Sequence, residues 1–285
     1  MNIRKITLNV GAEKPFRALH ISDNHLCLAD ERDNERKRNL ADARGNMFTG
    51  GHPEMIEARL REMVSYAAGE GMPLLCTGDV IDFVSVKNLE TAGEILRQAD
   101  TFMAVGNHEY SQYVGEAWED EAYKAQSFDD VIAAFPGNVW FQTRVIHGVK
   151  FIAMDNGYYY ITEELFRLFK EAMADGMPAV LLMHNPLYSP DTYAQVTAGK
   201  PASVPSYLNG CPEELLRSLD DHRYRQQKPD ALTLEFSRFC EEAPNLKAIL
   251  AGHLHKFYEA KMVSGIPQIV AGGGYAGEAV EYTFI

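Results

Sequence analysis

The stretch FMAVGNHEY, residues 102–110, changes from apolar to polar directly after a glycine. Its first half is typical of a buried β-strand, and Asn107, His108 and Glu109 follow that strand at once. A neutral amide beside an imidazole at the end of a buried strand indicates a binding site. The same pattern recurs along the chain and determines the fold that we expect.

Seven apolar runs, including this one, are predicted to form buried strands. They are 16–22, 73–78, 101–106, 149–155, 179–184, 246–252 and 266–272. Segments with helical spacing of apolar residues lie between many of them, at 53–70, 86–99, 162–175 and 231–242. This alternation predicts a layered α/β fold with a largely parallel centre. The stretches 138–152 and 257–285 are typical of further, antiparallel strands, so we expect one mixed sheet or two facing sheets.

The chain has 285 residues and no Ser/Gly/Pro-rich linker, so we expect a single domain over residues 1–285. Two polar segments, near 27–52 and 185–230, interrupt the alternation. They are predicted to be loop insertions, which act as lids over a site or are variable surface loops.

Composition limits the partners and the location that we expect. The formal net charge of −13 argues against a nucleic-acid-binding protein, whereas a small phosphorylated substrate is compatible with it because a bound metal reverses the local field. No apolar run reaches the roughly 18 residues that cross a bilayer, so no membrane partner is expected. The N-terminal MNIRKITLNV lacks the apolar core of a secretion signal, and four isolated cysteines favour a reducing compartment. We therefore expect a cytoplasmic protein; its oligomeric state is not predicted.

Side chains that bind metals follow five of the expected strands. They are Asp23, His25, Asp79, Asn107, His184, His253 and His255. Because the carboxyl ends of strands in an open α/β sheet share one edge, we expect these side chains to meet. Carboxylates, imidazoles and one amide oxygen, without cysteine, suit Mn, Fe, Zn or Co.

Seven ligands exceed the need of one tetrahedral zinc ion, but they suffice for two ions if one carboxylate bridges them. Asp79 is the natural bridge. Two ions held roughly 3.5–4 Å apart, with a bridging hydroxide as the nucleophile, are an arrangement used for phosphoryl hydrolysis.

The motifs DNH (23–25), GDVID (78–82), GNHE (106–109), His184 and GHLH (252–255), in this order, resemble those of the calcineurin-like metallophosphoesterases. The segments ISDNHL and GHLH are especially similar to the corresponding motifs of the branch that includes cyclic-nucleotide and glycerophosphodiester phosphodiesterases. The resemblance implies a four-layer α/β/β/α sandwich with two facing mixed β-sheets. It also implies a hydrolase that acts on phosphoester bonds with two divalent or trivalent metal ions.

The resemblance further implies a role for each residue. The first metal would be held by Asp23, His25 and His255, and the second by Asn107, His184 and His253. Asp79 would bridge the two ions, and His108 would contact the phosphate and protonate the leaving alkoxide.

Other motif residues are expected to support the ligands. Asp82 and Glu109 are interpreted as orienting groups that hydrogen-bond to ligating histidines. Asn24 is expected on the solvent side, without a role. Asn185 stands where many members of the family have a second histidine.

Several alternatives stay open at this point. The leading hypothesis is a phosphodiesterase for small phosphoesters, and the alternatives are a phosphomonoesterase, a nuclease or a non-catalytic scaffold of the same fold. Tyr158, Tyr159 and Tyr160 are expected to pack rather than to stack on a base. The basic residues of 223–228 are expected to form a solvated surface rather than an anion site.

Overall fold

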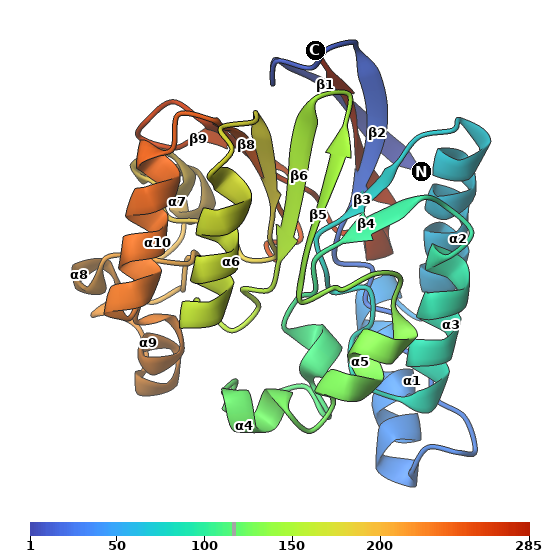
Figure 1. Ribbon diagram of the computed structural model, residues 1–285. Coiled ribbons are helices and arrows are strands. Elements are labelled where there is room, and N and C mark those ends of the chain that lie inside the picture. Colours follow the sequence, from blue (N-terminus) through green and yellow to red (C-terminus); the bar gives the residue numbers. More distant parts are fainter. Residues whose placement is uncertain (116–117) are drawn as a thin grey trace.

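The computed structural model describes residues 1–115 and 118–285 and contains two β-sheets that face each other (Figure 1). The first sheet has the order β1 (Asn2–Leu8), β11 (Glu278–Phe284), β2 (Phe16–Ile21), β3 (Leu74–Cys76) and β4 (Thr101–Met103). The second has the order β5 (Phe141–Ile146), β6 (Val149–Met154), β7 (Ala179–Leu182), β8 (Leu246–Ala251), β10 (Pro267–Val270) and β9 (Tyr258–Lys261).

Both sheets are mixed. Strands β2, β3 and β4 are parallel neighbours, as are β6, β7, β8 and β10. The pairs β11–β2, β5–β6 and β10–β9 are antiparallel. The prediction of two facing mixed sheets is therefore confirmed, and each predicted apolar run contains a strand.

Helices cover the outer face of each sheet (Figure 1). The first sheet carries α2 (Glu54–Gly69) and α3 (Val86–Leu96), and the second carries α6 (Glu163–Met173) and α10 (Ala231–Glu242). In α2 the predicted apolar stripe is buried against the sheet. Thr162 caps α6 by accepting a hydrogen bond from the backbone of Leu165, which fixes the start of that helix.

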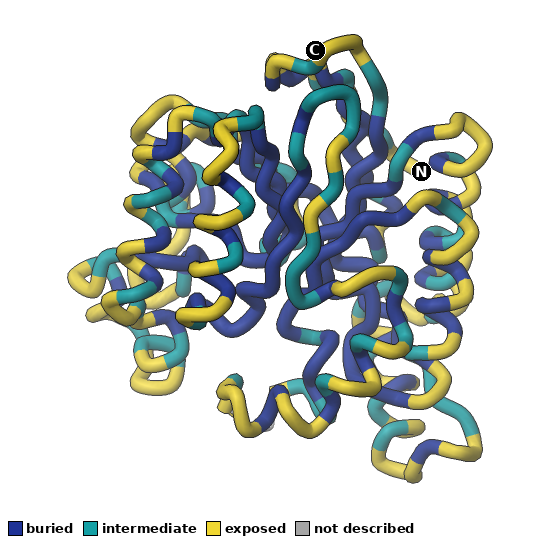
Figure 2. Tube along the Cα trace, in the orientation of Figure 1, coloured by how far each residue is buried: buried dark blue, intermediate teal, exposed yellow. Residues whose placement is uncertain are grey.

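The described residues form three apolar clusters, because the sandwich has three interfaces between its layers. One lies between the sheets and includes Phe151, Leu250 and Phe284. The other two lie between each sheet and its helices. Figure 2 shows the buried residues concentrated along the strands, with exposed residues on the outer sides of the helices.

The two polar insertions are not simple loops, so that prediction was wrong. The first contains α1 (Glu35–Thr49), and the second contains α7 (Pro190–Thr197), α8 (Glu213–Leu216) and α9 (Asp221–Gln227). Helix α1 buries only Ala41 and Gly45, so its sequence lacks an apolar stripe to reveal it. The short helices α4 (Glu121–Lys124) and α5 (Phe128–Ala134) precede the second sheet.

The described residues include no helix with both the length and the apolar character needed to cross a bilayer.

Candidate metal centre

The predicted ligands follow the carboxyl ends of strands from both sheets. Asp23 and His25 follow β2, Asp79 follows β3, and Asn107 follows β4. From the second sheet, His184 follows β7, and His253 and His255 follow β8. The parallel direction of these strands brings the side chains to one edge of the sandwich.

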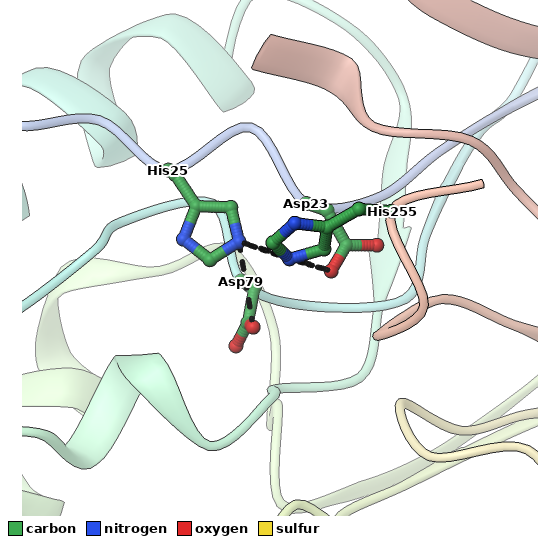
Figure 3. Close-up of side chains that lie close together, drawn as sticks. All are labelled: Asp23, His25, Asp79 and His255. Atoms are coloured by element: carbon green, nitrogen blue, oxygen red, sulfur yellow. Dashed lines mark hydrogen bonds and ion pairs between the residues drawn. The ribbon is translucent and has the colours of Figure 1, made fainter. Parts of the chain in front are cut away.

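Two groups of ligand atoms form at this edge. Asp23, His25, Asp79 and His255 each contribute one atom, all within 4.8 Å of one another, and Figure 3 shows these side chains converging. Asp79 belongs to the second group as well, with His184 and His253. Asp79 Oδ2 lies 3.7 Å from His25 Nε2 and 3.1 Å from His184 Nε2. One carboxylate is thus shared between the groups.

The donor set fits two cations. His25 Nε2 lies 2.9 Å from His255 Nε2, and His184 Nε2 lies 3.1 Å from His253 Nδ1. Imidazole nitrogens that face each other beside carboxylates are ligands of borderline divalent metals. Asn107 Oδ1 is buried without a hydrogen-bond partner among the described residues, which leaves an amide oxygen free to bind a cation.

The carboxylates create a negative field at both groups. Burial alone would lower the pKa of His25, but the carboxylates of Asp23 and Asp82 outweigh it and raise the pKa to about 10. Burial would also lower the pKa of His184, but the charge of Asp79 outweighs it and raises the pKa to about 9. Positive charge is therefore stabilised at both places.

The backbone at the site adopts conformations that are unusual for residues other than glycine. Left-handed φ angles occur at Asp23 (55°), His25 (51°), Asp79 (52°), His253 (70°) and His255 (53°). Such residues are uncommon, and they cluster at functional sites where the surrounding structure holds them.

Two glycines let the loops after β3 and β4 approach each other. A Cβ at Gly78 would lie 2.2 Å from the backbone nitrogen of Gly106, and a Cβ at Gly106 would lie 2.2 Å from Asp79 Oδ1. Any side chain at either position would separate Asp79 from the loop of Asn107.

Asp82 links the first group to helix α1. Its Oδ1 accepts a hydrogen bond from His25 Nδ1 at 2.9 Å and lies 3.3 Å from His108 Nδ1. Arg44 donates to both carboxylate oxygens from Nε at 2.6 Å and Nη2 at 2.8 Å. His25, Asp82 and His108 also form a third compact group, but this bidentate ion pair occupies the Asp82 carboxylate.

Glu109 binds backbone amides rather than histidine side chains, so the expected hydrogen bond to a histidine was wrong for this residue. Its carboxylate accepts from the backbone of Asp79 at 2.8 Å, Val80 at 2.6 Å and Gly106 at 2.7 Å. The buried carboxylate thereby joins the loops that carry Asp79 and Asn107. Burial, together with the charge of Asp79, raises the pKa of Glu109.

Two asparagines near the ligands are structural. Asn24 is fully buried rather than on the solvent side, because its loop packs against the segment of Gly274. Asn185 donates to the backbone oxygens of Asn156 at 2.9 Å and Gly157 at 3.1 Å. Asn185 therefore ties the end of β7 to the turn after β6.

Further residues that the sequence did not identify surround the ligands. Phe48 of α1 stacks on His25 with ring centroids 4.6 Å apart. Tyr159 Oη lies 2.5 Å from His253 Nε2. Glu119 accepts from Asn107 Nδ2 at 3.3 Å and from Gln226 Nε2 of α9 at 2.7 Å. Phe48 and Glu119 do not follow a strand, and Tyr159, which lies in the turn after β6, is not of a residue type expected to bind these metals, so the rule that selected the candidate ligands could not find them.

A cavity of about 700 Å³ opens over both groups. Arg44, Phe48 and Tyr275 line it beside the first group, and Trp118, Tyr207 and Arg223 line it farther along. His108 also lines the cavity, with a side chain that is 16% exposed.

The basic residues of 223–228 do not act as one patch. Arg225 pairs with Asp221 at 3.0 Å, and Lys228 pairs with Glu213 at 3.2 Å. Arg223 instead lines the cavity and has no carboxylate partner within 4 Å among the described residues.

Comparison with solved structures gives several matches of low sequence identity. A dimetal phosphatase from Danio rerio has 14% sequence identity and a TM-score of 0.51, over 91% of this chain and 88% of that one. A phosphopantetheinyl hydrolase from Mycobacterium tuberculosis has 11% identity and a TM-score of 0.42, over 96% and 92% of the two chains. A 5'-nucleotidase from Candida albicans has 14% identity and a TM-score of 0.42, over 96% and 48%.

Comparison of the sequence with curated proteins gives no match. The model of the calcineurin-like phosphoesterase family, by contrast, matches residues 16–257 and so contains every predicted ligand. Because this match covers most of the chain, the protein belongs to the calcineurin-like phosphoesterase family and is a phosphoester hydrolase.

Proposed function

We propose that the protein hydrolyses small phosphodiesters with two divalent metal ions. The observation that carries the proposal is that Asp79 belongs to both groups of ligand atoms. The first ion would be held by Asp23, His25 and His255, and the second by Asn107, His184 and His253. Two bound ions supply positive charge for the phosphate oxygens and make water a nucleophile near neutral pH.

His108 is the proposed acid for the leaving group. Its backbone N–H donates to Asp79 Oδ1 at 2.9 Å, which places the residue beside the shared ligand. Its Nδ1–H donates to the main-chain oxygen of Asp82 at 2.7 Å. In the imidazolium form the remaining ring nitrogen, Nε2, carries a second proton, which it can give to the alkoxide that leaves.

The surroundings of the cavity favour a diester. A phosphodiester carries only one negative charge, so its site needs little cationic charge beyond the metal ions. It also carries two organic groups, so its site should offer apolar surface on both sides of the phosphate. Arg44 lines the cavity but is engaged by Asp82. Aromatic rings flank both groups: Tyr275 lies 5.4 Å from the His255 ring, and Tyr207 lies 5.6 Å from the His253 ring.

A phosphomonoesterase is the second candidate because two other cations line the same cavity. Lys200 and Arg223 have no carboxylate partner within 4 Å among the described residues. A phosphomonoester carries more negative charge than a diester, and these side chains are suited to bind it.

The net charge of −13 argues against a nuclease, and four buried free cysteines support a cytoplasmic location.

The first experiment measures the metal content of protein purified without chelator. Hydrolysis of bis-p-nitrophenyl phosphate is then compared with that of p-nitrophenyl phosphate in the presence of Mn²⁺. We expect about two metals per chain and faster cleavage of the diester. Faster cleavage of the monoester would replace the diester proposal with the monoesterase.

The variant Asp79→Asn is the control for the shared ligand. It keeps the size of the side chain but removes the charge, so we expect it to lose metal and turnover together. An active Asp79→Asn protein with two metals would overturn the shared role of Asp79.

A further inference from the structure

The histidines at the site are held by hydrogen bonds at the ring nitrogen opposite the ligand group. His25 Nδ1 bonds to Asp82 Oδ1 at 2.9 Å, and His184 Nδ1 bonds to the backbone oxygen of Thr77 at 2.6 Å. Carboxylates and backbone carbonyls are the usual partners of metal-binding histidines. In the neutral form of each ring, the bond at Nδ1 leaves Nε2 with a lone pair that is directed to the ligand group.

His253 is held differently. Its Nδ1 lies 3.1 Å from His184 Nε2, on the side of the second group, and its Nε2 lies 2.5 Å from the hydroxyl of Tyr159. A neutral imidazole that offers the Nδ1 lone pair to a cation carries its proton on Nε2. That proton needs an acceptor in the protein, and the hydroxyl oxygen of Tyr159 lies at hydrogen-bond distance.

The backbone of Tyr159 is unusual for a bulky residue. Its φ angle is 63°, in the left-handed region that residues other than glycine rarely adopt. The turn is stabilised by a bond from the backbone N–H of Tyr159 to Asn156 O at 3.2 Å. The side chain of Asn156 also accepts from the backbone of His184 at 2.9 Å. One turn therefore positions both the tyrosine hydroxyl and a second-group histidine.

The neighbouring tyrosines have different surroundings. Tyr158 is 3% exposed and packs in the core beside Tyr110, at a centroid distance of 6.0 Å. Tyr160 donates to Glu121 on the surface at 2.5 Å. Only Tyr159 of these three contacts a candidate ligand through its hydroxyl, and it too is only 3% exposed. Tyr158 and Tyr159 are both buried, as expected for side chains that pack, and the hydroxyl of Tyr159 makes an additional contact with His253.

We propose that Tyr159 is a positioning residue for the second metal ion: its hydroxyl accepts the Nε2 proton of His253 and so presents Nδ1 to the cation. The inference rests on the proposed function in taking His253 as a ligand of that ion. Tyr207, also left-handed at a φ of 58°, supports the same ring by an edge contact at 5.6 Å and 76°.

The test compares the wild type with Tyr159→Phe, which removes only the hydroxyl. Titration of metal-free protein with Mn²⁺ is expected to show unchanged binding of the first ion. The affinity for the second should fall by about 10- to 100-fold, as for other partners of ligating histidines. Nitrogen NMR of the histidine rings in metal-free protein is expected to place the His253 proton on Nε2 in the wild type.

Tyr160→Phe is the matched control, because it removes the hydroxyl of the next residue, whose hydrogen bond lies at the surface. It should bind both ions as the wild type does. Equal loss of the second ion in Tyr160→Phe would assign the effect to the packing of the turn and overturn the inference. Unchanged second-ion affinity in Tyr159→Phe would overturn it too.

The wild-type NMR spectrum tests the inference even if Tyr159→Phe folds poorly. A His253 proton on Nδ1 in the metal-free wild type would contradict it directly. Failure of this inference is distinguishable from failure of the proposed function. Wild-type protein that binds fewer than two ions overturns the function, whereas two ions bound equally by wild type and Tyr159→Phe overturn only the role of the tyrosine.

Discussion

His108 belongs to neither of the two ligand groups that share Asp79. Its Nδ1 is hydrogen-bonded to a backbone oxygen, and its side chain lines the cavity. We expect His108→Ala to retain both metals and to slow hydrolysis of alkyl esters by about 10²- to 10⁴-fold, the usual contribution of a general acid. A p-nitrophenol leaving group needs less protonation, so its hydrolysis should slow less. Metal content and rates for both kinds of substrate check this prediction. Equal slowing of both substrates would show that His108 is not the acid.

His20 makes stability depend on pH. It is buried between the sheets, where its ring bonds to Thr77 Oγ1 at 2.8 Å and Tyr282 Oη at 3.2 Å. Burial lowers its pKa to about 3, below the roughly 6.5 of an unfolded chain. Between these values the unfolded state binds a proton that the folded state does not. Stability should therefore fall as the pH falls through this window, by about 1.4 kcal/mol per pH unit from this residue.

Urea unfolding of metal-free protein between pH 4 and pH 7 measures that slope. His20→Gln should flatten it, and His52→Gln should not, because the side chain of His52 is 67% exposed. A slope that is the same in wild type and His20→Gln would assign the proton to another group.

The sequence predicted the candidate ligands that the fold brings together, but not the residues that support them, for a physical reason. Each ligand follows an apolar strand, and strands of known direction place their ends at one edge. Tyr159 lies in a row of three tyrosines, and what distinguishes it is a φ angle of 63°. Backbone angles of this kind depend on the packing of the whole turn, so a pattern of residues in the sequence does not predict them.

Helix α1 is the element that most changes the site from what the sequence predicts. Its Arg44 forms a bidentate pair with the fully buried Asp82, and its Phe48 stacks on His25. Inner strands such as β3 and β7 were predictable because they are apolar and buried on both faces. Helix α1 was not, because a helix held by an ion pair and one aromatic ring needs no apolar stripe.

Arg44→Met tests the contribution of this helix. Arg44 is 20% exposed, and removing it takes both of its charge-assisted bonds from the buried Asp82 carboxylate, which keeps only the bond from His25 at Oδ1. We expect the free energy of unfolding to fall by about 2 kcal/mol. Arg44→Lys should restore only part of it because lysine cannot form the bidentate pair. Urea unfolding measures both variants.

Arg32→Met is the matched control for the ion pair. Arg32 bonds to Asp30 and Glu90, but its side chain is 45% exposed. Its removal should lower the free energy of unfolding by at most about 1 kcal/mol, as for other surface ion pairs. A loss at Arg44 no greater than that at Arg32 would mean that α1 does not stabilise Asp82.

For the whole molecule, bound ions are expected to raise thermal stability, because the ligand groups exist only in the folded state. An ion present at 100 times its dissociation constant adds about 2.7 kcal/mol. That should raise the melting temperature by several degrees, since each kcal/mol corresponds to about 2–4 °C in a large domain. Melting curves with Mn²⁺ and with chelator measure the difference. In Asp79→Asn the melting temperature should change little between Mn²⁺ and chelator. A full shift in that variant would mean that the ions stabilise the protein by binding at another site.

The shared position of Asp79 also bears on how the sandwich assembles. The first group joins three ligands from the first sheet to His255 from the second, and the other group joins Asp79 to two histidines of the second sheet. Neither sheet alone completes a group. An ion in either place is therefore a crosslink between the halves of the sandwich. Strong metal uptake during refolding should appear only when the two halves dock, which makes it a signal for the last step of folding.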